Sequence, residues 1–395
     1  MKIAIVHNTY QQAGGEDVVV EQESRMLQSH GHTVVFYRRS NHEIAQFSKA
    51  RQLLMVKDIV YSGESKREIR DLLRHEKPNI VHVHNTFIMI SPSAYEACQE
   101  LGIPVLQTLH NFRLLCPAWT LSRNGAVCEE CLTDGLWRGV LHGCYRDSRP
   151  MTAAVALMLK AHRTLGTWTH SVDGYVALSD FARSKFIDGG LPGQKIYVKP
   201  NFVQPDPGMS TGAGGYALFV GRLSQEKGPA TLISAWAKRK ITLPLVIVGE
   251  GPLRPTLEAQ VSAQGLTNIT FRGWLPREQT MAMMKEAVFL VTPSEWYETF
   301  GMVITEAFAC GVPVICSRMG AMKEIVADQS TGLHFTPGDA EDLATKVEWA
   351  CSHQSRLDDM RRSARREYES RYTAEKNYGR LMEIYDQTMH SCMRN

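Results

Sequence analysis

Long hydrophobic runs, a secretory leader and a strong charge imbalance are all missing from this sequence. No apolar stretch approaches the about 20 residues that span a bilayer. Residues 1–6 predict a strand rather than a signal peptide, because a long apolar core and a cleavage site are absent. Lys and Arg number 44 against 41 Asp and Glu, and the net charge of +3 does not indicate a nucleic-acid partner. The sequence therefore favours a cytoplasmic location.

The composition is that of a globular protein, with 44% hydrophobic and 22% charged residues. At 395 residues the chain is too long for one ordinary core, so we expect two domains. Strand and helix patterns alternate in both halves, which predicts an α/β fold of two doubly wound parallel sheets, each a Rossmann-like domain. The expected strands are 3–6, 33–37, 80–84, 104–109, 174–177 and 195–199, then 216–220, 245–248, 269–272, 288–291, 314–316 and 332–335.

A segment rich in proline, glycine and small polar residues, 200–215, marks the expected joint between the domains. We place the first domain at 1–203, with a cysteine-rich insertion at about 112–146, and the second domain at 204–371. Residues 372–395 predict a last amphipathic helix. A flexible joint predicts a central cleft, where ligands usually bind.

Four of the nine cysteines cluster in the insertion: Cys116, Cys128, Cys131 and Cys144. In a cytoplasmic protein such clusters bind metal more often than they form disulfides. Cys128 and Cys131 have a chelating spacing, and the other two would complete a tetrahedral structural zinc site. Free thiols that pack a loop are the alternative, because the outer spacings differ from those of a standard zinc ribbon.

Two glutamates flank the predicted start of a helix in the second half. Residues 288–291 predict a buried strand and the helix follows Gly301, so Glu298 lies on the connecting loop and Glu306 lies inside the helix. Phe300 and Gly301 would offer free backbone N–H groups at the positive end of this helix. Carboxylates beside such donors suit a ligand that carries hydroxyls and phosphates. Two unrelated surface glutamates are the ordinary alternative.

The pattern E-T-F-G-x-x-x-x-E, which begins at Glu298 and Thr299, is followed by A-x-A-C-G-V-P-V. Together they strongly resemble the donor-site signature of family-4 retaining glycosyltransferases, and the resemblance covers the whole chain. It implies the GT-B fold, with an acceptor-side first domain, a donor-binding second domain and a last helix, 372–395, that crosses back to the first domain. It also implies that Glu306 holds ribose hydroxyls, that Glu298 contacts sugar hydroxyls, and that Thr299, Phe300 and Gly301 border the donor.

A basic loop, G-R-L-x-x-x-K-G, follows the first strand of the second half. Its Arg222 and Lys227 lie at the carboxyl end of a strand, where α/β folds bind ligands. Together they could hold a diphosphate, Arg222 through paired hydrogen bonds from its planar guanidinium and Lys227 through the compact charge of its ammonium. Because the run is a specific signature of the same family, we favour a phosphate clamp over two solvated side chains. The clamp would stabilise the departing nucleotide diphosphate.

Other segments of the second half match the donor side of the family. Gly249 and Glu250 end the next strand in a tight turn. Arg272, Trp274 and Leu275 resemble the segment that borders the nucleobase, where backbone groups would read the base edge. Trp274 could stack on the base or pack in the core.

The first half supplies fewer candidates. His110 ends a strand and matches the family's histidine near the donor sugar, where it would hydrogen-bond a hydroxyl. Gly14 and Gly15 match the glycine loop over the donor diphosphate, although a plain loop before a helix is the alternative. The G-x-G-x-x-G fingerprint is missing, which disfavours a dehydrogenase. His82 and His84 could line the acceptor side, and the lack of an evident third ligand disfavours zinc there.

Residues 151–170 predict one amphipathic helix. Packing onto the sheet is the favoured interpretation, and contact with a membrane surface is the other. The apolar side consists of Val155, Met158, Leu159, Leu165 and Trp168.

The resemblance implies a hexosyltransferase-type enzyme that moves a sugar from a UDP- or GDP-sugar to a hydroxyl of a glycan or lipid-linked acceptor, in cell-surface polysaccharide synthesis at or near the inner membrane surface. No D-x-D sequence is present, so we expect metal-independent chemistry that requires no cofactor. Glu298 is the nearest candidate nucleophile, but we favour front-face attack over a covalent intermediate. A nucleotide-sugar epimerase and a non-catalytic sugar-nucleotide-binding protein are the alternatives. The base, the sugar, the acceptor and the oligomeric state stay open.

Overall fold

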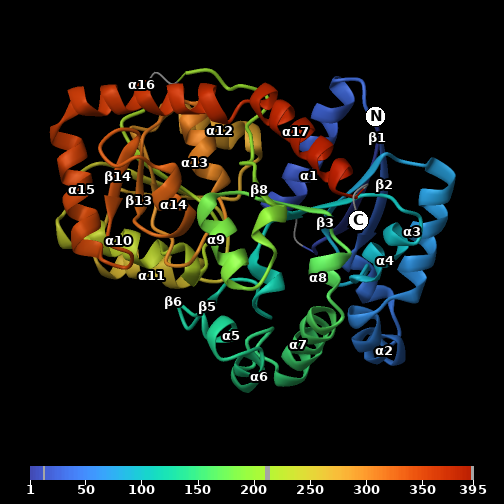
Figure 1. Ribbon diagram of the computed structural model, residues 1–395. Coiled ribbons are helices and arrows are strands. Elements are labelled where there is room, and N and C mark those ends of the chain that lie inside the picture. The colour runs from blue at the N-terminus through green and yellow to red at the C-terminus, as the bar shows by residue number, and fades with distance from the viewer. Residues whose placement is uncertain (12–13, 210–213, 393–395) are drawn as a thin grey trace. The chain divides into compact units, whose positions relative to one another are not determined.

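The computed structural model describes residues 1–11, 14–209 and 214–392, so part of the predicted joint, 210–213, lies outside the described residues. The chain forms two compact units, each built on a six-stranded parallel sheet (Figure 1). The N-unit comprises Met1–Leu121, Cys128–Lys199 and Tyr378–Asn395, and the C-unit comprises Ser122–Val127 and Pro200–Asn377. The predicted α/β architecture is confirmed.

The sheet of the N-unit reverses its strand order between β1 and β3, which is its topological switch point. All strand pairs in it are parallel. Every residue of β3 is buried, as expected for a parallel sheet covered on both faces. In spatial order the strands are β2 (Thr33–Ser40), β1 (Lys2–Thr9), β3 (Ile80–Asn85), β4 (Val105–Leu109), β7 (Gly174–Ala177) and β8 (Ile196–Val198).

Helices of the N-unit bury an apolar stripe and leave polar residues outside. In α1 the buried stripe contains Val19, Val20, Met26 and Leu27, but also Glu23. Late in the chain, α17 contributes to the same unit, and its Tyr378 ring stacks on His30 with 3.6 Å between centroids. The helices are α1 (Gly15–Ser29), α2 (Lys49–Val60), α3 (Gly63–Glu76), α4 (Ser93–Gln99), α5 (Glu130–Thr133), α6 (Trp137–His142), α7 (Arg149–Thr164), α8 (Thr167–His170), α9 (Asp180–Asp188) and α17 (Ala374–Cys392).

The single helix predicted over 151–170 is wrong, because the chain breaks between α7 and α8. Gly166 has φ of +70°, a left-handed conformation that ends the helix. Four of the five apolar side chains expected on one side are buried, and Leu165 is exposed. The helix packs against α2 and α6. The buried side chains are therefore not available to a membrane surface.

The C-unit has the strand order of a Rossmann fold, with its switch point between β9 and β12. Its strands in spatial order are β11 (Ile269–Gly273), β10 (Leu245–Val248), β9 (Ala217–Val220), β12 (Phe289–Thr292), β13 (Val314–Ser317) and β14 (Gly332–Phe335). Its helices are α10 (Pro229–Lys238), α11 (Arg254–Ala263), α12 (Arg277–Glu286), α13 (Met302–Ala309), α14 (Gly320–Ile325), α15 (Ala340–Ser352) and α16 (Gln354–Arg371). A separate antiparallel hairpin, which the sequence did not predict, pairs β5 (Ser122–Arg123) with β6 (Ala126–Val127).

One apolar core supports the strand ends of the C-unit. Trp236 is fully buried in it, and its indole nitrogen donates to the carbonyl of Leu243 at 2.8 Å. Burial of one large apolar side chain contributes about 1.5–3 kcal/mol. Within the described part of the chain, no helix is long and apolar enough to cross a bilayer.

Candidate active site

Two loops meet at the switch point of the C-unit. The loop after β9 carries Lys227, and the loop after β12 carries Glu298. Because β9 and β12 are neighbouring parallel strands, their carboxyl ends lie at the same edge of the sheet. Nζ of Lys227 lies 2.5 Å from Oε1 of Glu298. The structure therefore brings together two of the predicted catalytic residues.

Glu298 is held by three donors on one oxygen. Besides Lys227, the hydroxyl of Ser294 donates to Oε1 at 3.0 Å and the indole of Trp296 donates at 2.9 Å. Burial favours the neutral acid, but the Lys227 ammonium and these hydrogen bonds outweigh it and hold the pKa of Glu298 below its usual value. Glu298 is therefore an ionised, fixed carboxylate.

Glycine allows the loops at this edge to approach so closely. Gly228 has φ of +65°, and a Cβ there would lie 2.0 Å from the carbonyl oxygen of Pro293. Gly249 has φ of +141°, and a Cβ there would lie 1.9 Å from the carbonyl oxygen of Gly221. Any larger residue would push the loops apart. The turn predicted at Gly249 is thus a point of backbone contact between two strand ends.

Glu306 lies in α13 and is paired with a residue that the sequence did not single out. Nε of Arg277 lies 3.2 Å from Oε1 of Glu306, and the same guanidinium donates to the carbonyl of Gln204 at 3.1 Å. Burial raises the pKa of Glu306 even though Arg277 opposes it. Gly301 precedes the helix with φ of +100°, and no side chain caps its first amides. The helix start is therefore open to an acceptor from a ligand.

The other predicted donor residues differ in exposure. Arg222 and Arg272 are exposed, and the Arg222 side chain makes no ion pair with the described residues. Trp274 is 71% exposed, which excludes the core-packing alternative. Glu250 is ion-paired with Arg254. The remaining ones are half-buried or buried: Leu275 and Thr299 half-buried, and Phe300 buried against the ring of Tyr372.

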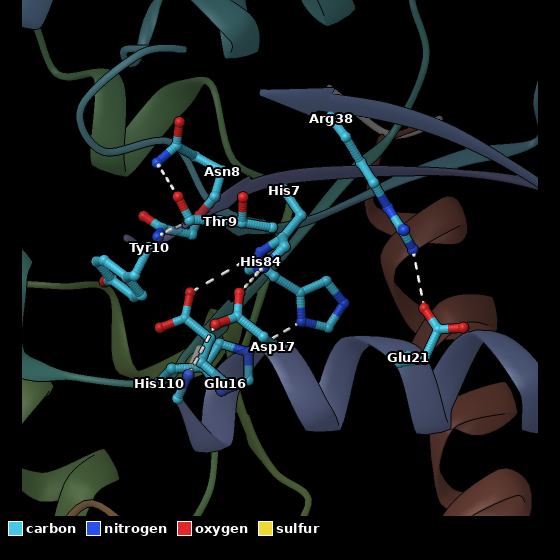
Figure 2. A network of polar contacts seen from close by, with 12 residues as sticks. His7, Asn8, Thr9, Tyr10, Glu16, Asp17, Glu21, Arg38, His84 and His110 are labelled. Atoms are coloured by element: carbon cyan, nitrogen blue, oxygen red, sulfur yellow. Dashed lines mark hydrogen bonds and ion pairs between the residues drawn. The ribbon is translucent and has the colours of Figure 1, made fainter. Parts of the chain in front are cut away.

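In the N-unit, histidines gather at the switch point between β1 and β3 (Figure 2). His7, His84 and His110 come from the ends of β1, β3 and β4. Nδ1 of His84 lies 2.9 Å from Nε2 of His110, and Nε2 of His7 lies 2.8 Å from Oδ1 of Asp17. His110 is thus hydrogen-bonded within its own unit, and its contact with a sugar stays a prediction.

Two carboxylates, Glu16 and Asp17, directly follow the glycine loop at Gly14 and Gly15. The backbone N–H of Gly14 donates to Asp17 at 2.9 Å, which caps α1. Glu16 is close to Tyr10 and accepts a hydrogen bond from Asn111 at 3.4 Å. Burial and the neighbouring Asp17 raise the pKa of Glu16 well above its usual value. The sequence predictions did not include either carboxylate, although both stand directly after the glycines.

The backbone does not itself require glycine at Gly14 and Gly15. Gly14 has φ of −116°, which any residue adopts, and a Cβ at either position would meet nothing within 4 Å. Residues 12–13 of the same loop lie outside the described residues. The role of the glycines over a donor phosphate therefore stays a prediction.

The four clustered cysteines form a pair rather than a tetrahedron. Cys116 and Cys131 hydrogen-bond to each other, and this contact lowers the pKa of Cys116. Four thiolates on zinc, with bonds of about 2.3 Å, need sulfurs about 4 Å apart. No three of these thiols, all within the described residues, lie within 4.8 Å of one another. The zinc site, which would include Cys128 and Cys144, therefore stays a prediction.

The statement that His82 and His84 lack a third ligand is wrong. Glu23 of α1 lies beside them, and the three ligand atoms are within 4.8 Å of one another. Oε1 of Glu23 is 3.1 Å from Nδ1 of His82 and 3.4 Å from Nε2 of His84. Its other oxygen lies 2.9 Å from Nζ of Lys199. We call Glu23, His82, His84 and Lys199 the buried cluster.

Comparison with known proteins agrees with this arrangement. Residues 13–207 match the model of Glycosyltransferase Family 4, and residues 212–367 match that of Glycosyl transferases group 1. An uncharacterized glycosyltransferase of Methanocaldococcus jannaschii is 27% identical over 73% of this chain and 78% of that protein. D-rhamnosyltransferase WbpZ of Pseudomonas aeruginosa is 30% identical over 55% of this chain and 60% of that protein.

Solved structures share the fold over nearly the whole chain. Sucrose-phosphate synthase of Thermosynechococcus elongatus has a TM-score of 0.74 and 18% identity over 99% of each chain. HepE of Anabaena, in complex with UDP, has a TM-score of 0.68 and 17% identity over 98% of this chain and 100% of that one.

Two six-stranded parallel sheets that resemble those of these solved structures define the GT-B fold. Within it, the chain belongs to the group 1, or family 4, glycosyltransferases. It is a glycosyltransferase enzyme.

Proposed function

We propose that this protein is a retaining glycosyltransferase that moves a sugar from a nucleotide diphosphate-sugar to a hydroxyl of a glycan or lipid-linked acceptor. The contact of Lys227 with Glu298 at the switch point of the C-unit carries the proposal. HepE has been solved with UDP and with UDP-glucose, and WbpZ is a D-rhamnosyltransferase. These relatives support a nucleotide-sugar donor.

Lys227 binds the donor diphosphate. Its side chain is 27% exposed, so it can contact a ligand while it stays paired with Glu298. The exposed guanidinium of Arg222 adds a second positive group from the same loop. Negative charge grows on the leaving phosphate in the transition state, and fixed positive groups stabilise it there. The basic side chains thus supply the leaving-group stabilisation, and we expect activity to persist in the presence of EDTA.

Glu298 orients the donor sugar rather than attacking it. Three donors hold Oε1 of Glu298 and, with the Lys227 ammonium, keep its pKa low, which weakens the carboxylate as a nucleophile. This favours front-face attack, in which the acceptor approaches the side from which the diphosphate leaves. The carboxylate then accepts hydrogen bonds from sugar hydroxyls.

Glu306 and Trp274 bind the nucleoside. Glu306 is partly buried in α13 and accepts hydrogen bonds from ribose hydroxyls, with Arg277 keeping it in place. Trp274 is exposed at the end of β11 and can stack on the base.

A role in cell-surface polysaccharide synthesis, at the cytoplasmic side of a membrane, suits a lipid-linked or glycan acceptor.

A thermal-shift screen with UDP-, GDP- and ADP-sugars, followed by a transfer assay, tests the proposal. We expect one nucleotide to raise the melting temperature, because a ligand that binds only the folded state stabilises it. Mass spectrometry should then detect a new glycoside with an added acceptor. An isomer of the donor formed without acceptor would instead show an epimerase. Absence of both transfer and hydrolysis for every donor would contradict an enzymatic role.

A further inference from the structure

A mostly apolar cavity lies in the N-unit among residues that the candidate active site does not use. Its volume is about 220 Å³. Leu114 and Leu115, in the turn after β4, line it together with Trp168 of α8 and Leu191, which follows α9. We call it the leucine cavity. Pockets for drug-sized ligands measure about 300–1,000 Å³, so this one suits a smaller molecule.

Two glycines after α9 also line the leucine cavity and help to keep it open. A Cβ at Gly189 would lie 2.2 Å from Cδ2 of Leu115, so a side chain there would displace the leucine. Gly190 has φ of +91°, which favours glycine, and a Cβ there would meet nothing within 4 Å. This part of the lining therefore consists of backbone without a side chain to fill the space.

One charged residue lines the leucine cavity. Arg163 of α7 is half-buried, and its Nη2 donates to the carbonyl of Leu114 at 2.9 Å. No carboxylate of the described residues forms an ion pair with Arg163. Burial lowers its pKa, and only the neighbouring Cys131 thiol acts in the opposite direction. Charges that are withdrawn from water normally have a partner, so an anion is missing beside Arg163.

Trp168 is a second lining residue with an unmet hydrogen bond. Its indole nitrogen is buried and has no partner among the residues that the structure describes. A buried indole N–H usually finds an acceptor. The walls of the leucine cavity therefore combine apolar surface with a positive charge and a donor for which the protein supplies too few acceptors.

We propose that the leucine cavity binds a small amphipathic anion, in which a carboxylate or phosphate is attached to a short apolar group. The planar guanidinium of Arg163 binds the anionic group through paired hydrogen bonds, and the leucines and Trp168 enclose the apolar part. A neutral apolar molecule would leave Arg163 without a counter-charge. An inorganic anion would leave the apolar walls in contact with water. The site does not depend on the proposed transfer reaction.

Titration of the whole chain with hexyl phosphate tests the site, because this probe carries both chemical features. Calorimetry measures Kd, and spectra of leucine-methyl-labelled protein show where the probe binds. We expect the methyl signals of Leu114, Leu115 and Leu191 to shift. Hexanol lacks the charge and inorganic phosphate lacks the chain, so each should bind the cavity at least about tenfold more weakly.

Three variants separate the role of Arg163 from an effect on folding. Arg163→Gln removes the charge, and its amide can still donate to the carbonyl of Leu114. It should weaken the binding of hexyl phosphate by about tenfold to a hundredfold. Arg163→Lys retains the charge and should recover part of the affinity. Lys160→Gln removes an exposed charge from the same helix, away from the cavity lining, and should leave Kd unchanged.

Each outcome supports or overturns the proposal. Equal Kd values for wild type and Arg163→Gln overturn it, as does binding of hexanol as tight as that of hexyl phosphate. Shifts confined to leucines of the C-unit would place the phosphate at the basic loop of Lys227 and overturn the cavity site. Retention on phosphatidylglycerol vesicles without binding of hexyl phosphate would overturn a free ligand in favour of a lipid. Loss of sugar transfer with these shifts intact would concern the proposed function alone.

Discussion

The strand ends of the two sheets carry charge in different ways. In the C-unit, the side chains of Lys227 and Glu298 are 27% and 14% exposed. In the N-unit, those of Lys199 and Glu23 are 1% exposed each. A partly exposed pair can exchange a partner for a ligand at low cost, whereas a buried pair cannot. The first pair is therefore suited to binding, and the second to holding its neighbours in one state.

The buried pair should give the largest effect on stability. Glu23→Ala leaves Lys199 uncompensated, so we expect the free energy of unfolding to fall by about 3–5 kcal/mol in urea denaturation. Because the pKa of Glu23 is held below its usual value, its stabilising contribution is present above about pH 4.3 and is lost as the pH falls below that value. A loss under 1 kcal/mol would show that the two pairs do not differ.

The exposed pair should give the largest effect on turnover. Lys227→Ala removes a positive group at the leaving phosphate, and we expect kcat to fall by about a hundredfold to a thousandfold. Glu298→Gln should reduce transfer as well. Steady-state kinetics with the fold checked by circular dichroism measures both. Lys346→Ala, which removes a lysine paired with Asp342 in the same unit, is the matched control. Turnover near that of the control would contradict the phosphate role.

Glu16, also in the N-unit, has a raised pKa, whereas the pKa of Glu23 is lowered. Burial and Asp17 raise the pKa of Glu16, so the folded protein favours its neutral form. Stability is therefore lost as the pH rises from the pKa of Glu16 in the unfolded chain towards its pKa in the folded protein. Glu16→Gln mimics the neutral form. We expect its stability relative to wild type to increase with pH, by at most about 1.4 kcal/mol per unit. Urea denaturation at pH 4.5, 6 and 7.5 measures this, and a flat difference would contradict burial of the carboxyl.

The smallest effect is expected at a surface ion pair of the N-unit. Lys2 and Glu76 lie 3.1 Å apart with side chains 36% and 25% exposed. Glu76→Ala should change the free energy of unfolding by about 1 kcal/mol or less. This variant measures the loss in free energy of unfolding for an exposed ion pair, with which the loss for Glu23→Ala is compared. A loss as large as that of Glu23→Ala would mean that burial does not set the scale.

The sheets could be predicted from sequence because their signal is local. Every strand expected in the two large sheets is present, since apolar runs between turn residues mark buried parallel strands. The contact of Lys227 with Glu298 could be anticipated because each lies in a family pattern at a strand end. The break before α8 was missed because one glycine at position 166 outweighed the helical periodicity around it.

The buried cluster could not be predicted from spacing, because Glu23 and Lys199 are 176 residues apart. A local signal did exist. Glu23 stands on the apolar stripe of α1, and His82 and His84 alternate onto one face of β3. Polar residues at core positions require partners, so each of them indicated that another buried group must exist. The partner itself, like Arg277 for Glu306, depended on the tertiary fold.

Tyr385 of α17 donates or accepts a hydrogen bond at 2.9 Å with His82, which precedes it by 303 residues. During translation, all six strands of the first sheet leave the ribosome long before this tyrosine is made. His82 therefore lacks this partner until the entire second sheet has been synthesised.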